Sequence, residues 1–216
     1  MLTVKKIILG EIETNTYVLE SDAVCAVIDP AIESRELSDF LKGKSVKYIL
    51  LTHGHFDHIA GVDSIVRETG AKVCIHTLDN EMLCDGNKSL YNSNLGGIQP
   101  HIKADMLLND GDEITLGETV IRVMHTPGHT NGSVCYILQN ERIIFSGDTL
   151  FRLTAGRTDL AGIEPIIAGR NELKSLQKIA NLAGDFRVLP GHNEETTLQF
   201  ERENNKYMRK KYASFG

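Results

Sequence analysis

The chain of 216 residues is 41% hydrophobic and 24% charged, the proportions of an ordinary globular protein, so we expect a single domain over residues 1–216. Its 29 acidic and 23 basic side chains leave a formal net charge of −6. This balance argues against nucleic acid or an anionic membrane as a partner, because neither would be attracted to the surface as a whole.

Short apolar runs rich in β-branched residues predict strands along the chain, each bounded by Gly, Pro, Asp or Asn. In chain order they lie at residues 4–9, 16–19, 24–28, 46–51, 72–75, 119–124, 134–138, 142–145 and 187–189. Residues 1–9 are typical of a first strand rather than a signal peptide, and no run reaches the roughly 18 apolar residues of a membrane span. The expected location is therefore the cytoplasm.

Helical patterns lie between these runs, at residues 34–41, 58–69, 171–182 and about 194–212. Many strands with helices set among them predict sheets covered by helices on their outer faces. The polar segment 84–103 is long for a loop in a compact domain. It is either a lid over a site or a mobile surface loop, and the sequence leaves both interpretations open.

Two other groups of residues are interpreted structurally. Three of the four cysteines, Cys25, Cys74 and Cys135, lie inside or beside apolar runs and none forms a Cys-x-x-Cys pair, so they are expected to be buried and reduced. The role of Cys84, between a helical segment and a polar loop, stays open. Basic residues near the C-terminus alternate with Glu201 and Glu203, which favours a solvated helix face over a binding patch. They are Arg202, Lys206, Arg209, Lys210 and Lys211.

Residues that commonly bind metals follow four of the predicted strands. Each group comes directly after a strand or after a short turn that ends it, where a rigid scaffold can hold it in a shared edge of the sheets. The residues are His53, His55, Asp57, His58, His129, Asp148 and His192. They are enough for two metal ions that share a carboxylate, and they predict a metal-dependent hydrolytic enzyme.

Imidazole nitrogen and carboxylate oxygen form the ligand set of catalytic zinc, and equally of manganese or iron. No thiolate is among them, which argues against a structural zinc site. Two neighbouring metal ions can supply hydroxide near neutral pH for attack on a carbonyl or phosphoryl group. Asp57 stands at the start of a predicted helix, where a carboxylate is favourable, and can be a ligand or a general base. Separate, unrelated histidines are the alternative, which the order of the seven residues disfavours.

The motifs resemble those of the metallo-β-lactamase superfamily. They are Thr-His-Gly-His-Phe-Asp-His at residues 52–58, Pro-Gly-His-Thr at 127–130, Gly-Asp-Thr at 147–149 and Pro-Gly-His at 190–192. Within this superfamily, the chain is similar to the short glyoxalase II-like hydrolases. The similarity lies in Asn-Thr-Tyr at 15–17, Gly-Arg-Thr-Asp at 156–159 and Glu-Thr-Thr at 195–197.

The resemblance implies an αββα sandwich of two mixed β-sheets, with the metals at one edge. It implies that His53, His55 and His129 hold the first metal and that Asp57, His58 and His192 hold the second. It also implies that Asp148 bridges the two, so that Asp57 and Asp148 are the catalytic carboxylates. Asp29 would support the metal-binding loop without contacting metal, although an Asp-Pro pair can also simply start a turn. The expected cofactors are two divalent ions, zinc first and iron or manganese as alternatives.

The resemblance implies a thioester substrate such as S-lactoylglutathione. The chain departs from full-length glyoxalase II enzymes in lacking a long C-terminal helical region after His192, and Arg157 stands where a lysine and a tyrosine would bind glutathione. Arg157 is therefore expected either to bind a substrate carboxylate or to pair with Asp159. The sequence does not indicate the acyl group, the native metal or the oligomeric state.

Other functions remain as alternatives. An iron-dependent persulfide dioxygenase with the same ligand pattern is the principal one, since Gly-Arg-Thr-Asp at 156–159 is also similar to that branch. A β-lactamase would be expected to be exported, a diiron flavoprotein would have a glutamate at His55, and the nuclease branches carry basic surfaces. A non-catalytic metal-binding module would usually have lost ligands.

Three further histidines are not expected to bind metal. His76 follows a strand and is expected to cap a helix. His125 precedes His129 by four residues, but Pro127 and Gly128 prevent the helix that this spacing would need. His101 is expected to be a solvated loop residue, with substrate contact as the alternative.

Overall fold

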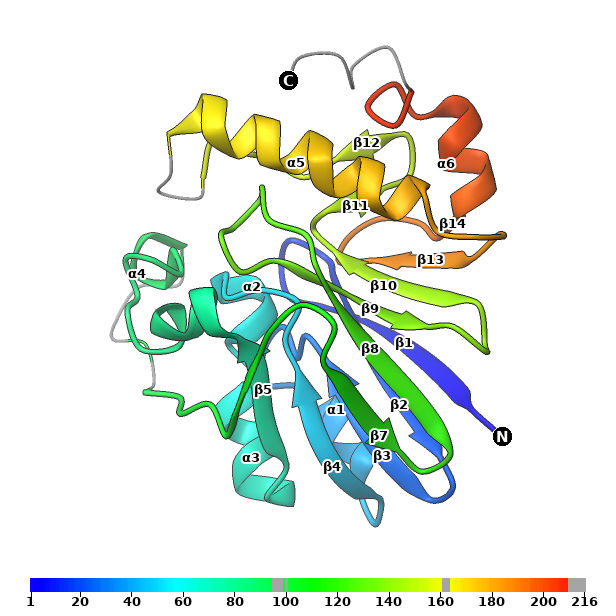
Figure 1. The fold of residues 1–216 in the computed structure, drawn as a ribbon. Helices are drawn as coiled ribbons and strands as arrows, with labels where there is room; N and C mark the ends of the chain where they lie inside the picture. The colour runs from blue at the N-terminus through cyan, green and yellow to red at the C-terminus, as the bar shows by residue number, and fades with distance from the viewer. Residues whose placement is uncertain (95–98, 100, 161–163, 210–216) are drawn as a thin grey trace.

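The computed structural model describes residues 1–94, 99, 101–160 and 164–209. Two six-stranded sheets face each other, with α1 and α3 outside the first and α5 and α6 outside the second (Figure 1). The expectation of an αββα sandwich is confirmed. No helix in the described part of the chain is both long enough and apolar enough to cross a bilayer.

The first sheet has the order β1-β2-β3-β4-β5-β6. The first three strands pair antiparallel, and β3 to β6 pair parallel through crossover connections. Its strands are β1 (Thr3–Leu9), β2 (Thr14–Ser21), β3 (Val24–Ile28), β4 (Ser45–Leu50), β5 (Lys72–His76) and β6 (Met106–Leu108).

The second sheet has the order β14-β13-β10-β9-β8-β7, antiparallel except where β10 pairs parallel with β13. Its strands are β7 (Glu113–Leu116), β8 (Thr119–His125), β9 (Val134–Leu138), β10 (Ile143–Gly147), β13 (Arg187–Pro190) and β14 (Thr196–Thr197). The hairpin of β11 (Leu150–Phe151) and β12 (Thr154–Ala155) follows β10.

The helices are α1 (Arg35–Leu41), α2 (Phe56–Ile59), α3 (Val62–Thr69), the 3₁₀ helix η1 (Thr77–Leu83), α4 (Tyr91–Asn94), α5 (Pro165–Ala180) and α6 (Leu198–Asn204). Three apolar clusters separate the four layers. One lies between the first sheet and its helices, one between the sheets, and one between the second sheet and α5 and α6. Successive residues of β3 point to opposite faces of the sheet, since Val27 belongs to the first cluster and Ala26 to the second.

Three of the predicted helices have different bounds. The helix expected over 58–69 is two helices, because Gly61 N donates to Pro30 O at 2.8 Å and a Cβ at Gly61 would lie 2.6 Å from Ile32 O. The helix expected to start at residue 171 starts at Pro165, where the Glu164 side chain caps it. Pro165 is favoured at this first position because its missing N–H would have had no partner.

The last predicted helix is much shorter than expected. Thr196 and Thr197 form β14, and the Thr197 hydroxyl caps α6 by accepting from Phe200 N. The helix ends at Asn204, because the Asn205 side chain accepts from Tyr207 N and turns the backbone. The rest of the expected helix, residues 210–212, lies outside the described residues. Strands β6 and β7 were not predicted, since β6 has only three residues and the apolar residues of β7 alternate with Glu113 and Thr115.

Two described residues of the segment 84–103 bond to the helices around the strand ends. Phe56 N donates to Ser89 O at 2.8 Å, and Gln99 Nε2 donates to Met82 O at 2.8 Å. The segment contains α4, while residues 95–98 and 100 lie outside the described residues. The lid and surface-loop interpretations therefore both remain predictions.

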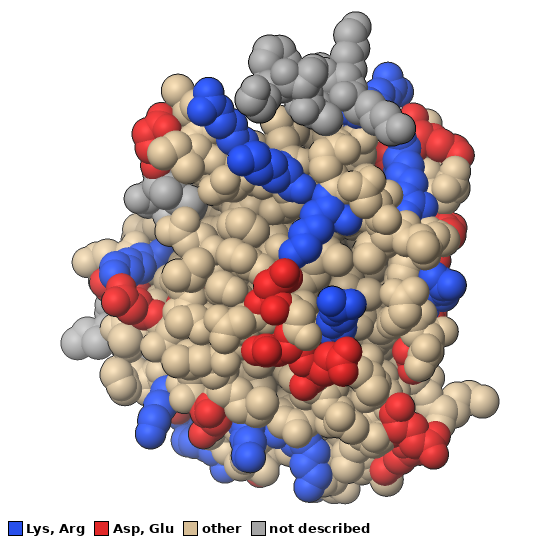
Figure 2. All heavy atoms as spheres, viewed as in Figure 1, with Lys and Arg blue, Asp and Glu red and all other residues tan. Residues whose placement is uncertain are grey.

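Among the described basic residues near the C-terminus, Arg202 is bound to backbone carbonyls rather than free. The Arg202 guanidinium donates to Ala180 O at 2.9 Å and to Gly184 O at 2.7 Å, so it satisfies carbonyls at the end of α5. Lys210 and Lys211 lie outside the described residues. Figure 2 shows basic and acidic side chains in contact on one face, and Lys178 on α5 pairs with Asp110 at 2.7 Å.

Candidate metal centre

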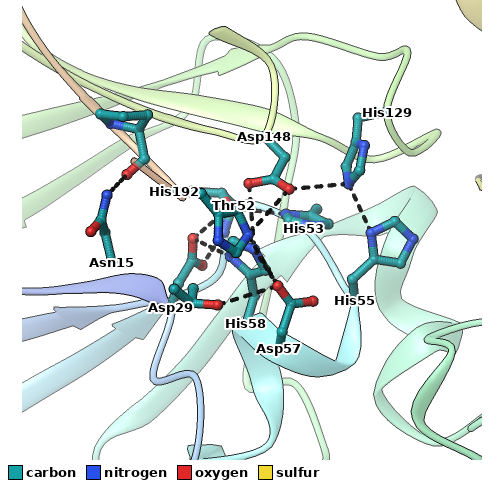
Figure 3. A network of polar contacts seen from close by, with 12 residues as sticks. Asn15, Asp29, Thr52, His53, His55, Asp57, His58, His129, Asp148 and His192 are labelled. Atoms are coloured by element: carbon teal, nitrogen blue, oxygen red, sulfur yellow. Dashed lines mark hydrogen bonds and ion pairs between the residues drawn. The ribbon is translucent and has the colours of Figure 1, made fainter. Parts of the chain in front are cut away.

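All seven of the predicted metal-binding residues lie together at one edge of the sandwich (Figure 3). His53, His55, Asp57 and His58 follow β4, with the last two inside α2. His129 follows β8, Asp148 follows β10 and His192 follows β13. The carboxyl ends of strands from both sheets therefore converge here.

The ligand atoms form three overlapping groups, each with its atoms within 4.8 Å of one another: His53–His55–His129, His53–His58–Asp148 and Asp57–His58–His192. Asp148 lies between the two outer groups. Its Oδ2 is 3.5 Å from His129 Nε2 and 3.6 Å from His192 Nε2, while its Oδ1 is 3.4 Å from His58 Nε2. One carboxylate thus faces both halves of the site.

The outer nitrogens of four histidines are held by oxygen atoms. His58 Nδ1 donates to Asp29 Oδ2 at 2.9 Å, His129 Nδ1 to Arg157 O at 2.8 Å, and His192 Nδ1 to Ile12 O at 3.1 Å. His53 Nδ1 lies 3.1 Å from the Thr52 hydroxyl, which itself donates to Asp29 at 2.6 Å. These contacts hold Nδ1 outward and direct Nε2 of each ring into the centre, which is how outer hydrogen bonds prepare metal-binding histidines.

The inward atoms are those that a metal would satisfy. Among the described residues, Nε2 of His53, His55 and His58 and Oδ1 of Asp148 are buried without a hydrogen-bond partner. A buried polar atom left in that state costs about 1–3 kcal/mol. His55 Nδ1 and His129 Nε2 also face each other at 2.9 Å. This donor set fits a pair of divalent cations.

The two halves of the site differ in charge. Burial, assisted by nearby histidines, holds the pKa of His53 well below its ordinary value and lowers that of His55 to about 3, so both rings are neutral. Burial also disfavours the charged form of His58, but Asp57, Asp148 and Asp29 outweigh it and raise the His58 pKa well above its ordinary value.

In the second half, burial would raise the Asp57 pKa, but His58 and His192 outweigh it and hold that pKa well below the ordinary range. Asp57 in turn helps to raise the His192 pKa against the effect of burial. In the metal-free second group the carboxylates therefore favour protonation of the His58 and His192 imidazoles. A cation that binds there must displace the imidazole protons.

Asn15 and Tyr17 hold the His192 loop against the first hairpin. Asn15 Nδ2 donates to Pro190 O at 2.9 Å and to Asn193 O at 3.0 Å, and the Tyr17 hydroxyl donates to Pro190 O at 2.7 Å. Thr14 Oγ1 on the same strand donates to Asp57 Oδ2 at 3.3 Å. The first hairpin therefore positions one ligand and contacts another.

Close approach of the backbone requires glycine beside two ligands. A Cβ at Gly191 would lie 2.2 Å from Asp148 Oδ1 and 2.8 Å from His58 Cε1, and a Cβ at Gly156 would lie 1.8 Å from Asp148 O. All three distances are inside van der Waals contact. The glycines in these two motifs are thus needed for space around the ligands.

The other predicted residues fall into two groups. Asp29 contacts Thr52 and His58, as expected for a supporting residue, whereas the Arg157 side chain makes two 2.9 Å hydrogen bonds with Asp159 at the surface. That pairing agrees with the structural interpretation of Arg157, and its contact with substrate stays a prediction. Its backbone carbonyl contributes directly, since it accepts from His129.

His76 caps η1 as predicted, with Nδ1 accepting from Leu78 N at 3.3 Å. His125 is not among the groups of ligand atoms and stacks on His76, with 4.1 Å between ring centroids. His101 is exposed. Cys25, Cys74 and Cys135 are buried and all four cysteines are free, with Cys84 at the surface.

Sequence reasoning missed two buried carboxylates beside the site. Asp79 on η1 accepts from Gly54 N, Thr130 Oγ1 and Gly132 N. Glu172 on α5 accepts from His129 N at 3.1 Å, and burial holds its pKa well above the ordinary value. Neither lies in a ligand motif, and only the fold brings them to the metal-binding loops.

Comparison with known proteins agrees with this geometry. The model of the metallo-beta-lactamase superfamily matches residues 9–192. A probable metallo-hydrolase, YqgX, of Bacillus subtilis (strain 168) is 35% identical over 207 residues, which cover 93% of this chain and 94% of that protein. A hydroxyacylglutathione hydrolase of Francisella tularensis subsp. novicida (strain U112) is 36% identical over 181 residues, which cover 82% of this chain and 62% of that protein.

Two solved structures share the fold over nearly their whole length. The B3 metallo-beta-lactamase BLEG-1 superposes with a TM-score of 0.88 at 36% identity, covering 95% of this chain and 99% of that one. TTHA1623 in a di-iron-bound form superposes with a TM-score of 0.81 at 32% identity, covering 94% of this chain and 99% of that one. The fold and the His/Asp cluster support a metal-dependent hydrolase with a dinuclear site. This chain belongs to the metallo-beta-lactamase superfamily.

Proposed function

We propose that this protein is a dinuclear metal-dependent hydrolase of small thioesters, with hydroxyacylglutathione thioesters such as S-lactoylglutathione as the substrate class. The observation that carries the proposal is the convergence of seven ligand residues on one edge, with unpartnered nitrogen and oxygen atoms facing inward. The similarity to a hydroxyacylglutathione hydrolase supports the substrate class. That similarity covers 62% of the relative, so the substrate belongs to the proposal.

In this proposal His53, His55 and His129 hold one metal, Asp57, His58 and His192 hold the other, and Asp148 faces both. Zinc is the first candidate because it is suited to histidine and carboxylate ligands without redox chemistry. Iron is the second candidate, since the related TTHA1623 was solved in a di-iron-bound form. Manganese remains compatible with the same donor atoms.

Two metal ions bound at these residues would supply a deprotonated water and would polarise the scissile carbonyl. The chain's own residues prepare the site for them. Asp29, Arg157 O and Ile12 O hold the outer nitrogens of three of these histidines, so the inner nitrogens point into the centre and cannot rotate away. Asp57 and Asp148 would contribute the negative charge that the five imidazoles, neutral when they bind metal, do not provide.

The decisive experiment is loss of the thioester absorbance of S-lactoylglutathione, measured on metal-free protein reconstituted separately with zinc, manganese and iron. We expect turnover with at least one metal, lost when a chelator is added and restored by that metal. The matched control is His53→Ala treated in the same way. Full metal loading without turnover on this thioester or on a panel of acyl-glutathiones would overturn the proposal.

A second candidate function is β-lactam hydrolysis, favoured by the similarity to BLEG-1. A chromogenic cephalosporin tested on the same reconstituted samples separates the two functions. A persulfide dioxygenase, which would use iron, is distinguished by oxygen uptake on glutathione persulfide. Thioester turnover well above the cephalosporin rate, with no oxygen uptake, is the result expected from the proposal.

A further inference from the structure

The Asp79 side chain joins two of the metal-binding loops. Its Oδ2 accepts from Gly54 N at 3.2 Å, between His53 and His55, and from Thr130 Oγ1 at 2.6 Å, next to His129. Its Oδ1 accepts from Gly132 N at 2.7 Å. The two loops are about 75 residues apart in the chain, and this one carboxylate bonds to both.

The contacts require a carboxylate at this position. Three donors converge on two oxygens of a side chain that is only 1% exposed. An asparagine has one acceptor oxygen, and its NH2 group can only donate. In one orientation this NH2 group would face the Gly132 N–H, and in the other it would face the Gly54 and Thr130 donors. A Cβ at Gly132 would lie 2.7 Å from Asp79 Cγ, so the loop packs directly on the carboxylate.

Asp79 supports a different part of the centre from Asp29. Asp29 contacts Thr52 and His58, and through Thr52 it reaches His53. Asp79 contacts the loops that carry His53, His55 and His129, which form one of the three ligand groups. Its hydrogen bonds do not reach Asp57, His58 or His192 within the described residues. Asp79 thus supports one ligand group, whereas Asp29 reaches a histidine in each half of the centre.

We propose that Asp79 is a positioning residue that sets the affinity of the His53–His55–His129 group for its metal by locking the Gly54 and Thr130 loops together. The inference rests on the ligand assignment of the proposed function. It is independent of the substrate. Asp79 does not act on substrate, because its two oxygens are already occupied by donors from the protein.

The test is a titration of metal-free protein with Co²⁺, followed by absorption spectroscopy, and with Zn²⁺ in competition with a chromophoric chelator. The variants His129→Ala and His192→Ala each lack one proposed ligand, so the binding step that each variant loses identifies that step in the titration of the wild-type protein. We expect Asp79→Asn to lower the metal affinity of one step, the step that is lost in His129→Ala. The expected decrease is about 10- to 100-fold, the usual effect of losing an outer hydrogen-bond partner. The step that His192→Ala removes should keep its affinity.

Glu201→Gln is the matched control for loss of a buried carboxylate. Glu201 is fully buried and accepts from Thr196, Asn205 and Leu153, none of which is a ligand. We expect Glu201→Gln to lower the melting temperature and to leave the affinity for both metal equivalents unchanged. If Asp79→Asn fails to fold, Thr130→Val removes one donor to Asp79 while keeping the side-chain shape, and Thr130→Ser keeps that donor. Thr130→Val should weaken the same step, and Thr130→Ser should weaken it less.

Equal weakening of both steps, or no weakening in either Asp79→Asn or Thr130→Val, would overturn the inference. The titration needs no substrate, so failure to hydrolyse thioesters would leave it standing. If wild-type protein binds a single equivalent, the ligand assignment in the proposed function is wrong, and the inference is overturned with it.

Discussion

Asp29 accepts a hydrogen bond from His58 Nδ1 at 2.9 Å and holds Thr52 through two further bonds, of 2.6 Å to the hydroxyl and 2.8 Å to the amide. The Thr52 hydroxyl in turn lies 3.1 Å from His53 Nδ1. One carboxylate, itself outside the groups of ligand atoms, therefore orients a histidine in each half of the centre. Residues outside the proposed ligand set therefore hold these histidines in place.

Asp29→Asn should weaken metal binding in both halves, because the amide cannot accept from all three donors at once. The expected loss is about 10- to 100-fold in each step, as is usual for such outer partners. Competition with a chromophoric chelator measures it. An Asp29→Asn protein that binds both metals with wild-type affinity would show that the ligands orient themselves without Asp29.

His53→Ala and Asp148→Ala should each abolish turnover while the chain stays folded. Each removes one proposed ligand at the edge of the sandwich and leaves the three apolar clusters intact. Activity on S-lactoylglutathione and circular dichroism of the same samples give the two readouts. Activity that survives either change would contradict the proposed dinuclear mechanism.

Arg157→Ala tests whether this side chain binds a substrate carboxylate. If it does, KM should rise while kcat changes little, because binding is lost equally in the ground and transition states. Asp159→Asn is the matched control, since it breaks the same surface pair and leaves the guanidinium in place. An unchanged KM in Arg157→Ala would assign Arg157 to the structural pair alone.

Gly191→Ala should reduce metal affinity, since the added Cβ would lie 2.2 Å from Asp148 Oδ1. Gly169→Ala is the control: the nearest atom to its Cβ would be Thr158 Oγ1 at 3.8 Å. Because Gly169 lies inside α5, we expect this control to stabilise the protein by about 0.5–1 kcal/mol. Thermal unfolding and metal content measure both. Full metal loading of Gly191→Ala would show that the backbone can move aside.

His76→Asn should reduce the loss of stability at acidic pH. Burial, together with His125, lowers the His76 pKa to about 4, whereas the unfolded side chain takes up a proton near pH 6.5. His76 therefore contributes stability above pH 6.5 that is lost as the pH falls toward 4. The full shift from 6.5 to about 4 corresponds to an upper limit of roughly 3–4 kcal/mol, at about 1.4 kcal/mol per pH unit.

Asparagine at residue 76 can still accept from Leu78 N and cap η1, but it does not titrate. Melting temperatures of metal-free wild-type and His76→Asn proteins, measured from pH 7 to pH 4, give the comparison. His53 and His55 also have lowered pKa values, and they contribute equally in both proteins. The contribution of His76 is therefore the difference between the two slopes of melting temperature against pH. Parallel slopes would contradict the assignment to His76.

The helix bounds show where local sequence patterns reach their limit. Ser34 and the residues after it predicted α1 correctly, because the N-cap and the buried face are both local. The break at Gly61 was missed, because it depends on Pro30 O, which takes the Gly61 N–H. The end of α6 was missed because Asn205, whose side chain accepts from Tyr207 N, is itself held by a hydrogen bond to the distant Thr154 O.

The sequence by itself determined the family, the sandwich fold and the set of residues that meet at the centre, because each candidate ligand has a distinctive side chain and stands directly after a strand. Only the tertiary structure decided what holds those ligands. Arg157 O and Ile12 O are backbone atoms that any residue type would provide, and Asp79 is one acidic residue among 29. Such partners have no sequence signature, because their role depends on contact between segments that are distant in the chain.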